Sequence, residues 1–376
     1  MRNCIERSFR ETALSNGLPK LIAPDARVVV ICVARIGDTL LSTPVLQAIK
    51  DACPDGEVTC LAHPKRLEML QGLSCIDRLA GITKKTAWWQ GRLGAKRWDY
   101  ALVYGRDDEL EKYALRAAHR VIGFARAGGE GQSRLFHVAV APPANIAHAV
   151  DERLMLAQAL GIQARSKRVL YQISDPEMAA ADRWFRHRIG SKGKRFIGLQ
   201  FASFPTKAYR DWPVDHVTAL GNKILDRYDD VKLLCLGGPA DAQKGKAVAT
   251  ALGSRCENIA GELTLRESSA VMSRLSLYIG VDTGPTHVAG ALGIPMVVLY
   301  HCRHRGRHLM PLEHPTPIVV IEHSQTDQDC STETPMSDIS VDAVWAAVQR
   351  TLENLCRPAK SATLRADHGR APTLST

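Results

Sequence analysis

The stretch that decides the fold reads YIGVDTGPTHVAGALGIPMVVLY and spans residues 278–300. An apolar run typical of a buried strand ends at Asp282, and a tight turn with a proline follows. A helical pattern rich in Ala and Gly then continues to Gly293, ahead of a second apolar run. Two buried strands joined by a helix are the unit of a parallel sheet, so we predict an α/β fold.

The same alternation of apolar runs and helical patterns recurs on both sides of this unit. We predict strands at residues 27–34, 57–61, 99–104, 120–124, 195–200, 231–236, 277–281 and 296–300. We predict helices at residues 39–52, 64–71, 108–119, 149–160, 214–227, 240–252, 266–274, 285–292 and 339–356, and one more that begins near Asp175. The pattern therefore predicts two doubly wound parallel sheets, which join near residue 190.

The chain divides into five segments on this pattern. We predict an N-terminal extension at 1–25, a first domain at 26–185 and a second domain at 186–335. A C-terminal helix at 336–356 is expected to pack back across the domains, and a polar tail at 357–376 is expected to be disordered.

The charge balance favours anionic partners. The 376 residues include 49 basic and 39 acidic side chains, which gives a net charge of +10. Such a surface suits nucleic acid, an anionic membrane face or phosphorylated substrates. Aromatic residues make up only 6% of the chain, which argues against stacking on single-stranded nucleic acid.

The cysteines and apolar runs bear on the compartment. None of the ten cysteines forms a C-x-x-C pair, and Cys32 and Cys235 lie inside apolar runs. This pattern favours a reducing compartment over a disulfide framework. The first 25 residues lack the apolar core of a signal peptide, and the apolar run at 28–34 is too short to span a bilayer. We therefore expect a cytosolic protein.

In an open α/β sheet, ligands gather beyond the carboxyl ends of the strands, so strand-end turns are the candidate sites. The turn after residue 281 offers two hydroxyls, an imidazole and free backbone N–H groups at a helix start, through Thr283, Gly284, Thr286 and His287. These groups predict a phosphate site. An ordinary turn capped by an aspartate is the alternative.

A second strand-end turn lies in VVVICVARIGDTLLSTP, residues 28–44. Arg35, Gly37, Asp38 and Thr39 follow the apolar run at the start of a helical pattern. Glycine permits a tight turn, and a helix start favours anions. Helix capping by Asp38 is the alternative. A G-x-G-x-x-G dinucleotide fingerprint is absent from this turn.

Two further turns carry charged side chains. The segment QFASFPTKAYRDWP, residues 200–213, contains Lys207 and Arg210, which suit phosphate neutralisation or form a solvated basic loop. The segment LLCLGGPADAQKG, residues 233–245, contains Asp241, which can accept hydrogen bonds from a ribose diol or cap a helix.

These motifs together resemble glycosyltransferase family 9, the ADP-heptose:lipopolysaccharide heptosyltransferases. RIGDTLLSTPVLQAIK is similar to the family's R-x-G-D-x-(L/I)-x-x-(T/S)-P opening. VDTGPTHVAGALGIPMVVLY resembles its specific D-T-G-x-x-H-x-A-x-A-L-x-x-P signature. PTKAYRDWP, LGGPADAQKG and RWDYALVY resemble shorter family segments, and all matches occur in family order over roughly residues 26 to 355.

The resemblance implies a GT-B fold, in which two Rossmann-like domains face a cleft, with the acceptor on the first domain and the nucleotide sugar on the second. It implies inverting, metal-independent transfer of a heptose from ADP-heptose, as co-substrate, to a lipopolysaccharide core or related envelope glycan. By the same resemblance Asp38 is the general base. The implied donor-binding residues are Lys207, Arg210, Asp241, Asp282, Thr283, Gly284 and His287. Acceptor or phosphate orientation falls to Arg35, Gly37 and Thr39.

The resemblance also implies a cytoplasmic enzyme, peripheral on the cytoplasmic face of the inner membrane, with an anionic glycolipid acceptor and no nucleic acid partner. Three alternatives stay open: a GT-B sugar-nucleotide epimerase, a transferase for another sugar nucleotide or acceptor, and a non-catalytic polyanion-binding protein. Lys207 and Arg210 compete for the phosphate role, because the loop before Trp212 is longer than the family's usual form.

Two segments depart from the family pattern. HCRHRGRHLMPLEH, residues 301–314, is expected to be an anion-binding loop; Cys302, His304 and His308 as metal ligands are the alternative. TKKTAWWQGRLGAKRW, residues 83–98, mixes Trp with Lys and Arg, which suits an anionic interface or a solvated loop with a packed Trp98.

Overall fold

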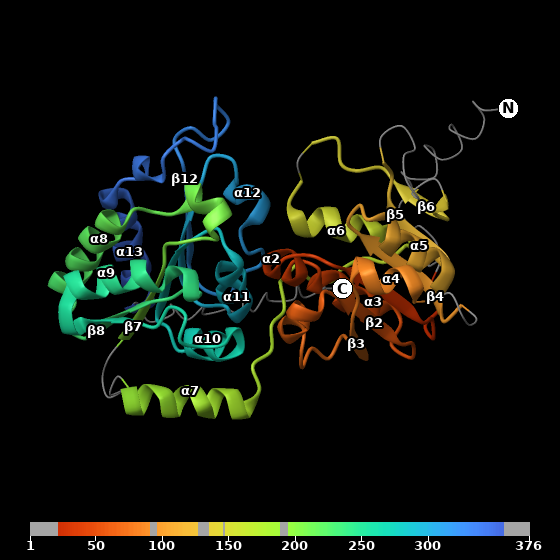
Figure 1. Cartoon of the computed structure of the whole chain (residues 1–376), viewed down its shortest axis with the longest axis horizontal. Coiled ribbons are helices and arrows are strands. Elements are labelled where there is room, and N and C mark those ends of the chain that lie inside the picture. The colour runs from red at the N-terminus through yellow and green to blue at the C-terminus, as the bar shows by residue number, and fades with distance from the viewer. Residues whose placement is uncertain (1–21, 91–95, 127–134, 146, 189–194, 357–376) are drawn as a thin grey trace, which may run out of the picture.

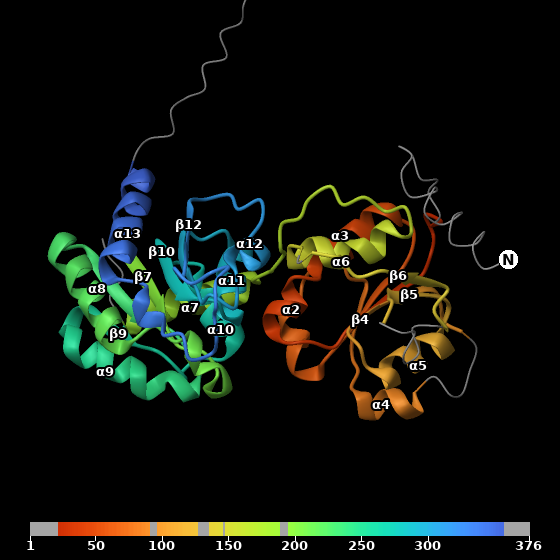
Figure 2. The same ribbon diagram turned by 90° about the horizontal axis from the view of Figure 1, so that it is seen from above.

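The computed structural model describes residues 22–90, 96–126, 135–145, 147–188 and 195–356 and forms two lobes, each built on its own sheet (Figure 1). Figure 2 shows the same two lobes from above. The expected tail, most of the expected N-terminal extension and the junction near residue 190 lie outside the described residues.

Six parallel strands form the first sheet, in the order β3-β2-β1-β4-β5-β6. Their bounds are β1 Val28–Cys32, β2 Val58–Ala62, β3 Arg78–Gly81, β4 Trp98–Tyr104, β5 Ala118–Phe124 and β6 Val138–Val140. Every residue of β1 is buried, as expected for a central strand covered on both faces.

The second sheet repeats this topology with the order β12-β11-β10-β7-β8-β9, and its strands are also parallel. Their bounds are β7 Arg195–Gln200, β8 Val231–Cys235, β9 Cys256–Asn258, β10 Leu277–Val281, β11 Met296–Tyr300 and β12 Ile318–Glu322. Strand order reverses between β10 and β7, and between β1 and β4 in the first sheet. Such switch points leave a crevice at the carboxyl ends of the strands.

Helices cover the faces of both sheets. The α-helices are α2 Ile36–Leu40, α3 Thr43–Ala52, α4 Lys84–Trp89, α5 Asp108–Ala117, α6 Ala149–Gln158, α7 Asp175–Arg188, α8 Val214–Arg227, α9 Ala242–Leu252, α10 Leu265–Met272, α11 Gly284–Leu292, α12 Gly306–Leu309 and α13 Val341–Cys356. Short 3₁₀ helices occupy Pro64–Met69, Pro205–Arg210, Pro239–Asp241, Gly253–Arg255 and Met336–Asp338.

The predicted α/β class with two parallel-sheet domains is confirmed, and the structure adds four strands to the eight predicted. The missing strands are β3, β6, β9 and β12, and all are at least partly exposed. The predicted helix at 39–52 is two helices, because the chain breaks at Leu41 and Ser42 ahead of Pro44. The predicted helix at 64–71 is a 3₁₀ helix.

Two helices depart from the expected division. We expected the 336–356 segment to pack across the domains, but the main contacts of α13 are with α8, β11 and β12. Its buried side chains, Val344 and Val348 among them, belong to the second domain's core, which explains this position. Most of helix α7 lies within the expected first domain, which ended at residue 185, yet the helix packs on α10 of the second. We therefore place the domain boundary before α7.

The cysteine pattern led us to expect no disulfide framework, but the structure joins Cys302 and Cys330, with a Cα–Cα distance of 6.0 Å. The two residues are 28 positions apart, and only the parallel pairing of β11 with β12 brings their loops together. Within the ranges given above, no helix is long and apolar enough to cross a bilayer.

Candidate functional site

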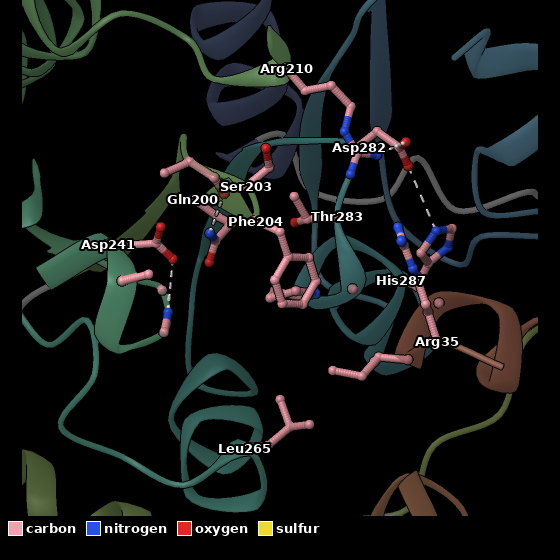
Figure 3. A pocket seen from close by; sticks show the side chains of 18 of the residues that line it. Arg35, Gln200, Ser203, Phe204, Arg210, Asp241, Leu265, Asp282, Thr283 and His287 are labelled. Carbon is pink, nitrogen blue, oxygen red and sulfur yellow. Dashed lines mark hydrogen bonds and ion pairs between the residues drawn. The ribbon is translucent and has the colours of Figure 1, made fainter. Parts of the chain in front are cut away.

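A cavity of about 570 Å³ lies where the two lobes meet (Figure 3). One wall comes from residues 35–38 and Leu41, around α2 of the first lobe. The facing wall comes from the turns that follow β7, β8 and β10 of the second lobe. The strand-end turns singled out in the sequence therefore open into one cavity, as the carboxyl ends of parallel strands at a switch point should.

Most of the predicted site residues line this cavity. They are Arg35, Gly37, Asp38, Arg210, Asp241, Asp282, Thr283, Gly284 and His287. Two predicted residues do not line it. Thr39 is buried and donates its hydroxyl hydrogen bond to the Arg35 carbonyl at 2.8 Å, and the Lys207 ammonium lies 5.7 Å from the Tyr209 ring.

Asp282 is the centre of the second-lobe wall. It follows β10, and its Oδ2 accepts a hydrogen bond from Arg210 Nη1 at 2.9 Å, in an ion pair whose side chains are 6% and 11% exposed. His287 Nε2 lies 3.7 Å from Oδ1, and His304 Nδ1 lies 3.9 Å from Oδ2. The Nε of Arg210 is buried without a hydrogen-bond partner within the described residues.

Both histidines at Asp282 are neutral at pH 7. Burial lowers the pKa of His287, and the negative charges of Asp282 and Asp38 only partly oppose this effect. Burial also lowers the pKa of His304 to about 4. The Tyr209 hydroxyl lies 2.8 Å from His304 Nε2, whereas the other ring nitrogen of His304, Nδ1, is the one near Asp282. The Arg210 guanidinium is therefore the fixed cation of this wall.

The start of α11 is shaped for close approach between the lobes. Thr286 lies inside the helix and its hydroxyl donates to the Val281 carbonyl at 2.5 Å, so this hydroxyl holds the turn. A Cβ on Gly284 would come within 3.1 Å of Ile36, and a Cβ on Gly37 within 2.6 Å of the His287 ring. The two glycines thus let α2 and α11 meet beside the cavity.

Asp38 faces this wall from the first lobe. The N-cap of α2 is Arg35, so Asp38 is not the capping residue and the alternative interpretation of its role is wrong. Its side chain is 48% exposed, and its Oδ1 accepts a hydrogen bond from Arg153 Nη2 at 2.9 Å. Arg153 is itself held by Ser42 Oγ at 3.2 Å and by the Ala149 carbonyl at 2.9 Å. These bonds orient an otherwise solvated carboxylate toward the cavity.

Asp241 approaches the cavity from the turn after β8. Its Oδ2 accepts a hydrogen bond from the Gly238 N–H at 2.9 Å, so it does support its own turn. Burial raises the pKa of this carboxyl group. The positive φ of Gly237, +151°, lets the chain fold tightly against this side chain.

Sequence reasoning missed several lining residues. It also missed Arg153, which does not line the cavity but holds Asp38; Arg153 carries no local signal, because its partner is 115 positions away. Phe204 is 57% exposed and lines the cavity together with Gln200, Ser203 and His304. A strand-end loop position was the only available signal for Phe204 and Ser203.

The segments 301–314 and 83–98, which depart from the family pattern, lie in different lobes. Cys302, His304 and His308 do not form a metal-sized group with one another among the described residues. Cys302 is joined to Cys330, and His304 Nδ1 lies 3.9 Å from Asp282 Oδ2. Trp98 is buried in the first core, whereas Trp88 and Trp89 on α4 are 54% and 58% exposed. Residues 91–95 of that segment lie outside the described ranges.

The chain is similar to known glycosyltransferases in sequence and in fold. The model of the family described as glycosyltransferase family 9 (heptosyltransferase) matches residues 95–339. The lipopolysaccharide core heptosyltransferase OpsX of Haemophilus influenzae is 23% identical over 285 residues, which cover 72% of this chain and 78% of that protein.

Two solved structures share the fold. A family 9 glycosyl transferase from Veillonella parvula superposes with a TM-score of 0.76 at 19% identity, covering 89% of this chain and 100% of that one. The Escherichia coli heptosyltransferase WaaC with ADP superposes with a TM-score of 0.66 at 17% identity, covering 86% and 99%.

Proposed function

This chain belongs to glycosyltransferase family 9, and we propose that it transfers a heptose from ADP-heptose to a sugar of a lipopolysaccharide core or related envelope glycan, with inversion at the anomeric carbon. One observation carries the proposal. Asp38, a partly solvated carboxylate, faces the Arg210–Asp282 pair and the start of α11 across a single cavity. A base on one wall and a phosphate site on the other suit transfer between an acceptor and a nucleotide sugar.

The donor is assigned to the second-lobe wall. Its diphosphate would accept hydrogen bonds from Arg210 and from backbone N–H groups at the start of α11. Asp241 would accept hydrogen bonds from a ribose diol, and the exposed ring of Phe204 would offer an apolar face to the base or the sugar; both residues line the cavity. Lys207 is not assigned a contact, since it does not line the cavity.

Asp38 acts as general base in this mechanism. It removes the proton from the acceptor hydroxyl while that oxygen forms a bond to the anomeric carbon. The bond between the anomeric carbon and the phosphate oxygen breaks, and its electron pair leaves with ADP. Attack from the face opposite the leaving group inverts the configuration. Arg210 stabilises the charge that develops on the leaving diphosphate, so we propose that the reaction needs no metal ion.

Release of ADP tests the reaction. Purified protein is given ADP-heptose with and without a heptose-free lipopolysaccharide core, and Asp38→Asn is compared with the wild type. Asp55→Asn, at an exposed position outside the cavity, is the matched control. We expect acceptor-dependent release that falls about 10²–10⁴-fold in Asp38→Asn and is unchanged in Asp55→Asn. Equal rates in wild type and Asp38→Asn would remove Asp38 as the base.

The same assay separates the alternatives. An epimerase would convert the sugar nucleotide without any acceptor and would release no ADP. A transferase with another donor or acceptor would show release only with that pair. A polyanion-binding protein would show binding that falls steeply with salt and does not depend on Asp38.

We further propose that the protein works in the cytoplasm, peripheral on an anionic membrane surface where a glycolipid acceptor would lie. The support is the exposed Trp88 and Trp89 on α4, which also carries Lys84 and Lys85. Aromatic and basic side chains on one helix suit the interface of an anionic bilayer.

A further inference from the structure

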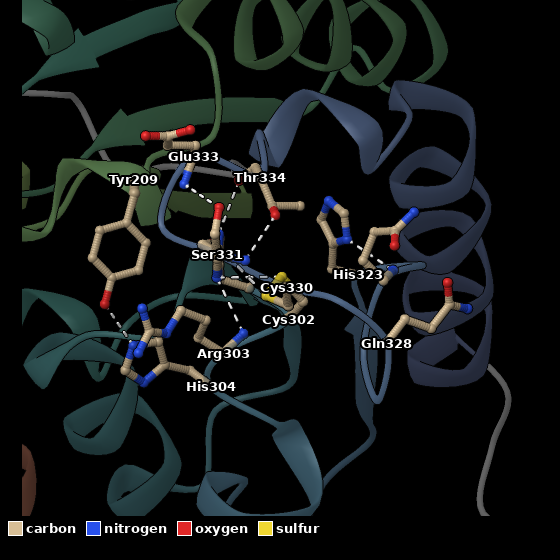
Figure 4. The surroundings of a disulfide bond; sticks show 12 residues. Tyr209, Cys302, Arg303, His304, His323, Gln328, Cys330, Ser331, Glu333 and Thr334 are labelled. Carbon is tan, nitrogen blue, oxygen red and sulfur yellow. Dashed lines mark hydrogen bonds between the residues drawn. A yellow bond between two sulfur atoms is a disulfide. The ribbon is translucent and has the colours of Figure 1, made fainter.

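A compact group of side chains that could hold a metal ion includes both cysteines of the disulfide, whose surroundings Figure 4 shows. His301 and Cys302 follow directly after β11, and Cys330 comes from the loop after β12. One ligand atom from each of the three residues lies within 4.8 Å of the other two, and this is the one such group found within the described residues. We propose that His301, Cys302 and Cys330 form a zinc site in the reduced protein, and that the disulfide is the oxidised form of this site.

The imidazole of His301 is already oriented for this role. Its Nε2 lies 2.9 Å from the Thr334 carbonyl oxygen, which can only accept a hydrogen bond. Nε2 therefore carries the hydrogen, and Nδ1 presents its lone pair 3.7 Å from the Sγ of Cys302. A ligating histidine usually donates its other ring N–H to such a partner. In the disulfide form Nδ1 accepts from the Arg303 N–H at 3.2 Å, and the metal would replace this bond.

The donor set selects a borderline-soft metal. Two thiolates and one imidazole are common zinc ligands, and zinc adds a fourth ligand to complete a tetrahedron. A second cavity, of about 430 Å³, is lined by both cysteines. It gives the ion a route of entry and leaves room for a water molecule as the fourth ligand.

Formation of the site is chemically balanced. A dithiol reductant donates two electrons to the Cys302–Cys330 bond and becomes a disulfide itself, while both cysteines become thiols. Zinc binding then releases the two thiol protons and leaves the imidazole neutral. In a reducing compartment the three residues would bind zinc, and under oxidising conditions the two cysteines would form the disulfide seen in the structure.

The site lies next to the proposed donor cavity. The His301 ring packs on Tyr209 with a centroid distance of 4.9 Å, and the Tyr209 hydroxyl contacts His304, which lines that cavity. Either a zinc ion or the disulfide would hold the 323–334 loop against the end of β11. The zinc proposal does not depend on which sugar the protein transfers.

Zinc content of the full-length reduced chain tests the proposal. The protein is reduced with a phosphine without oxygen, supplied with zinc and dialysed, and bound zinc is measured by elemental analysis. We expect about one zinc per chain and its loss in Cys302→Ser, Cys330→Ser and His301→Gln. Glutamine keeps a donor near the position of Nε2 but has no counterpart of the Nδ1 ligand.

The chain offers a matched control in a second thiol pair. Cys235 and Cys256 have their sulfur atoms 3.8 Å apart but belong to no metal-sized group with a histidine. Cys235→Ala should therefore keep the zinc. Cys330 is half-buried, so the Cys330→Ser variant should fold. Cobalt bound in place of zinc would report thiolate ligation by its absorption spectrum. The proposal is overturned if reduced wild type holds no more zinc than Cys330→Ser. ADP release is measured separately, so failure here leaves the transferase proposal standing.

Discussion

The carboxylate of Asp38 depends on one neighbour for its orientation, the guanidinium of Arg153. Arg153→Met removes the 2.9 Å hydrogen bond and the links to Ser42 and Ala149. We expect kcat to fall by up to about 10²-fold, because a misplaced base costs that much, while the KM for the nucleotide sugar stays close to its wild-type value. Steady-state kinetics with the donor varied measures both parameters.

The matched control for this prediction is Arg165→Met, since the Arg165 side chain is 82% exposed. It removes the same charge without touching the cavity. A fall in kcat of equal size in both variants would mean that net charge, rather than orientation of Asp38, is responsible.

His304 makes the stability of the fold depend on pH. Its folded-state pKa of about 4 lies below the ordinary value of 6.5. As pH falls from 6.5 toward 4, the unfolded chain binds a proton at this residue that the folded chain does not. The stability contribution is therefore complete above pH 6.5 and is lost as the pH falls through this window.

We expect wild type to lose on the order of 2 kcal/mol more unfolding free energy than His304→Gln between pH 7 and pH 4. Glutamine keeps an acceptor for the Tyr209 hydroxyl but cannot take up the proton. Urea unfolding at a series of pH values measures the difference, and the other buried histidines act equally in both proteins. Parallel stability curves would show that His304 is not desolvated.

The contact between α2 and α11 depends on a missing side chain. A Cβ at Gly37 would stand 2.6 Å from the His287 ring, so Gly37→Ala must displace either this buried ring or the helix that carries Gly37. We expect a loss of about 1–3 kcal/mol in unfolding free energy and a lower kcat, because Asp38 lies on that helix. Gly238→Ala is the control for stability, since its Cβ would meet nothing closer than 4.0 Å. Equal stability of the two variants would contradict the prediction.

The elements that the sequence predicts best are those whose burial leaves a continuous apolar run. The predicted bounds of 195–200, 277–281 and 296–300 coincide with β7, β10 and β11. The strands that were missed are short or partly exposed: β3 and β6 have few buried side chains, and their patterns resemble those of loops. A strand that is buried on both faces has a continuous apolar sequence, whereas a partly exposed strand includes polar residues and loses this signal.

Some residues of the candidate site could be predicted from the sequence and others could not. Residues on strand-end turns, such as Asp38 and Asp282, could be predicted because parallel strands bring their carboxyl ends together. Arg153 and the partner of Cys302 could not be predicted, because their contacts join positions 115 and 28 residues apart. Such contacts follow from how the helices and loops pack, which no local pattern records.

Polar and apolar contacts join the two lobes of the molecule besides the α2–α11 contact. The Lys167 N–H donates to Glu313 Oε2 at 3.0 Å, and the Arg266 guanidinium lies 5.0 Å from the Tyr171 ring. His148 Nε2 lies 2.9 Å from the Met310 carbonyl, and Arg266 Nη1 donates to the Glu68 carbonyl at 3.1 Å. Buried apolar side chains of both lobes also belong to one continuous cluster, Tyr171 and Tyr300 among them. The proposed base and the proposed phosphate site lie on different lobes, so the distance between them depends on how the two lobes pack together.

The proposed membrane contact is made by the first lobe, which also carries the base. Trp88→Ala with Trp89→Ala removes two exposed aromatic rings from α4. We expect binding to vesicles of phosphatidylglycerol and phosphatidylethanolamine to weaken at least about tenfold, because each apolar side chain that enters a bilayer interface contributes up to roughly 1.5–3 kcal/mol. Cosedimentation measures the bound fraction.

The control for this prediction is Phe204→Ala, which removes an equally exposed ring that lines the cavity between the lobes. This variant should leave vesicle binding unchanged. If the double variant binds as wild type does, α4 does not face the membrane, and an acceptor presented there would have to reach Asp38 from another side.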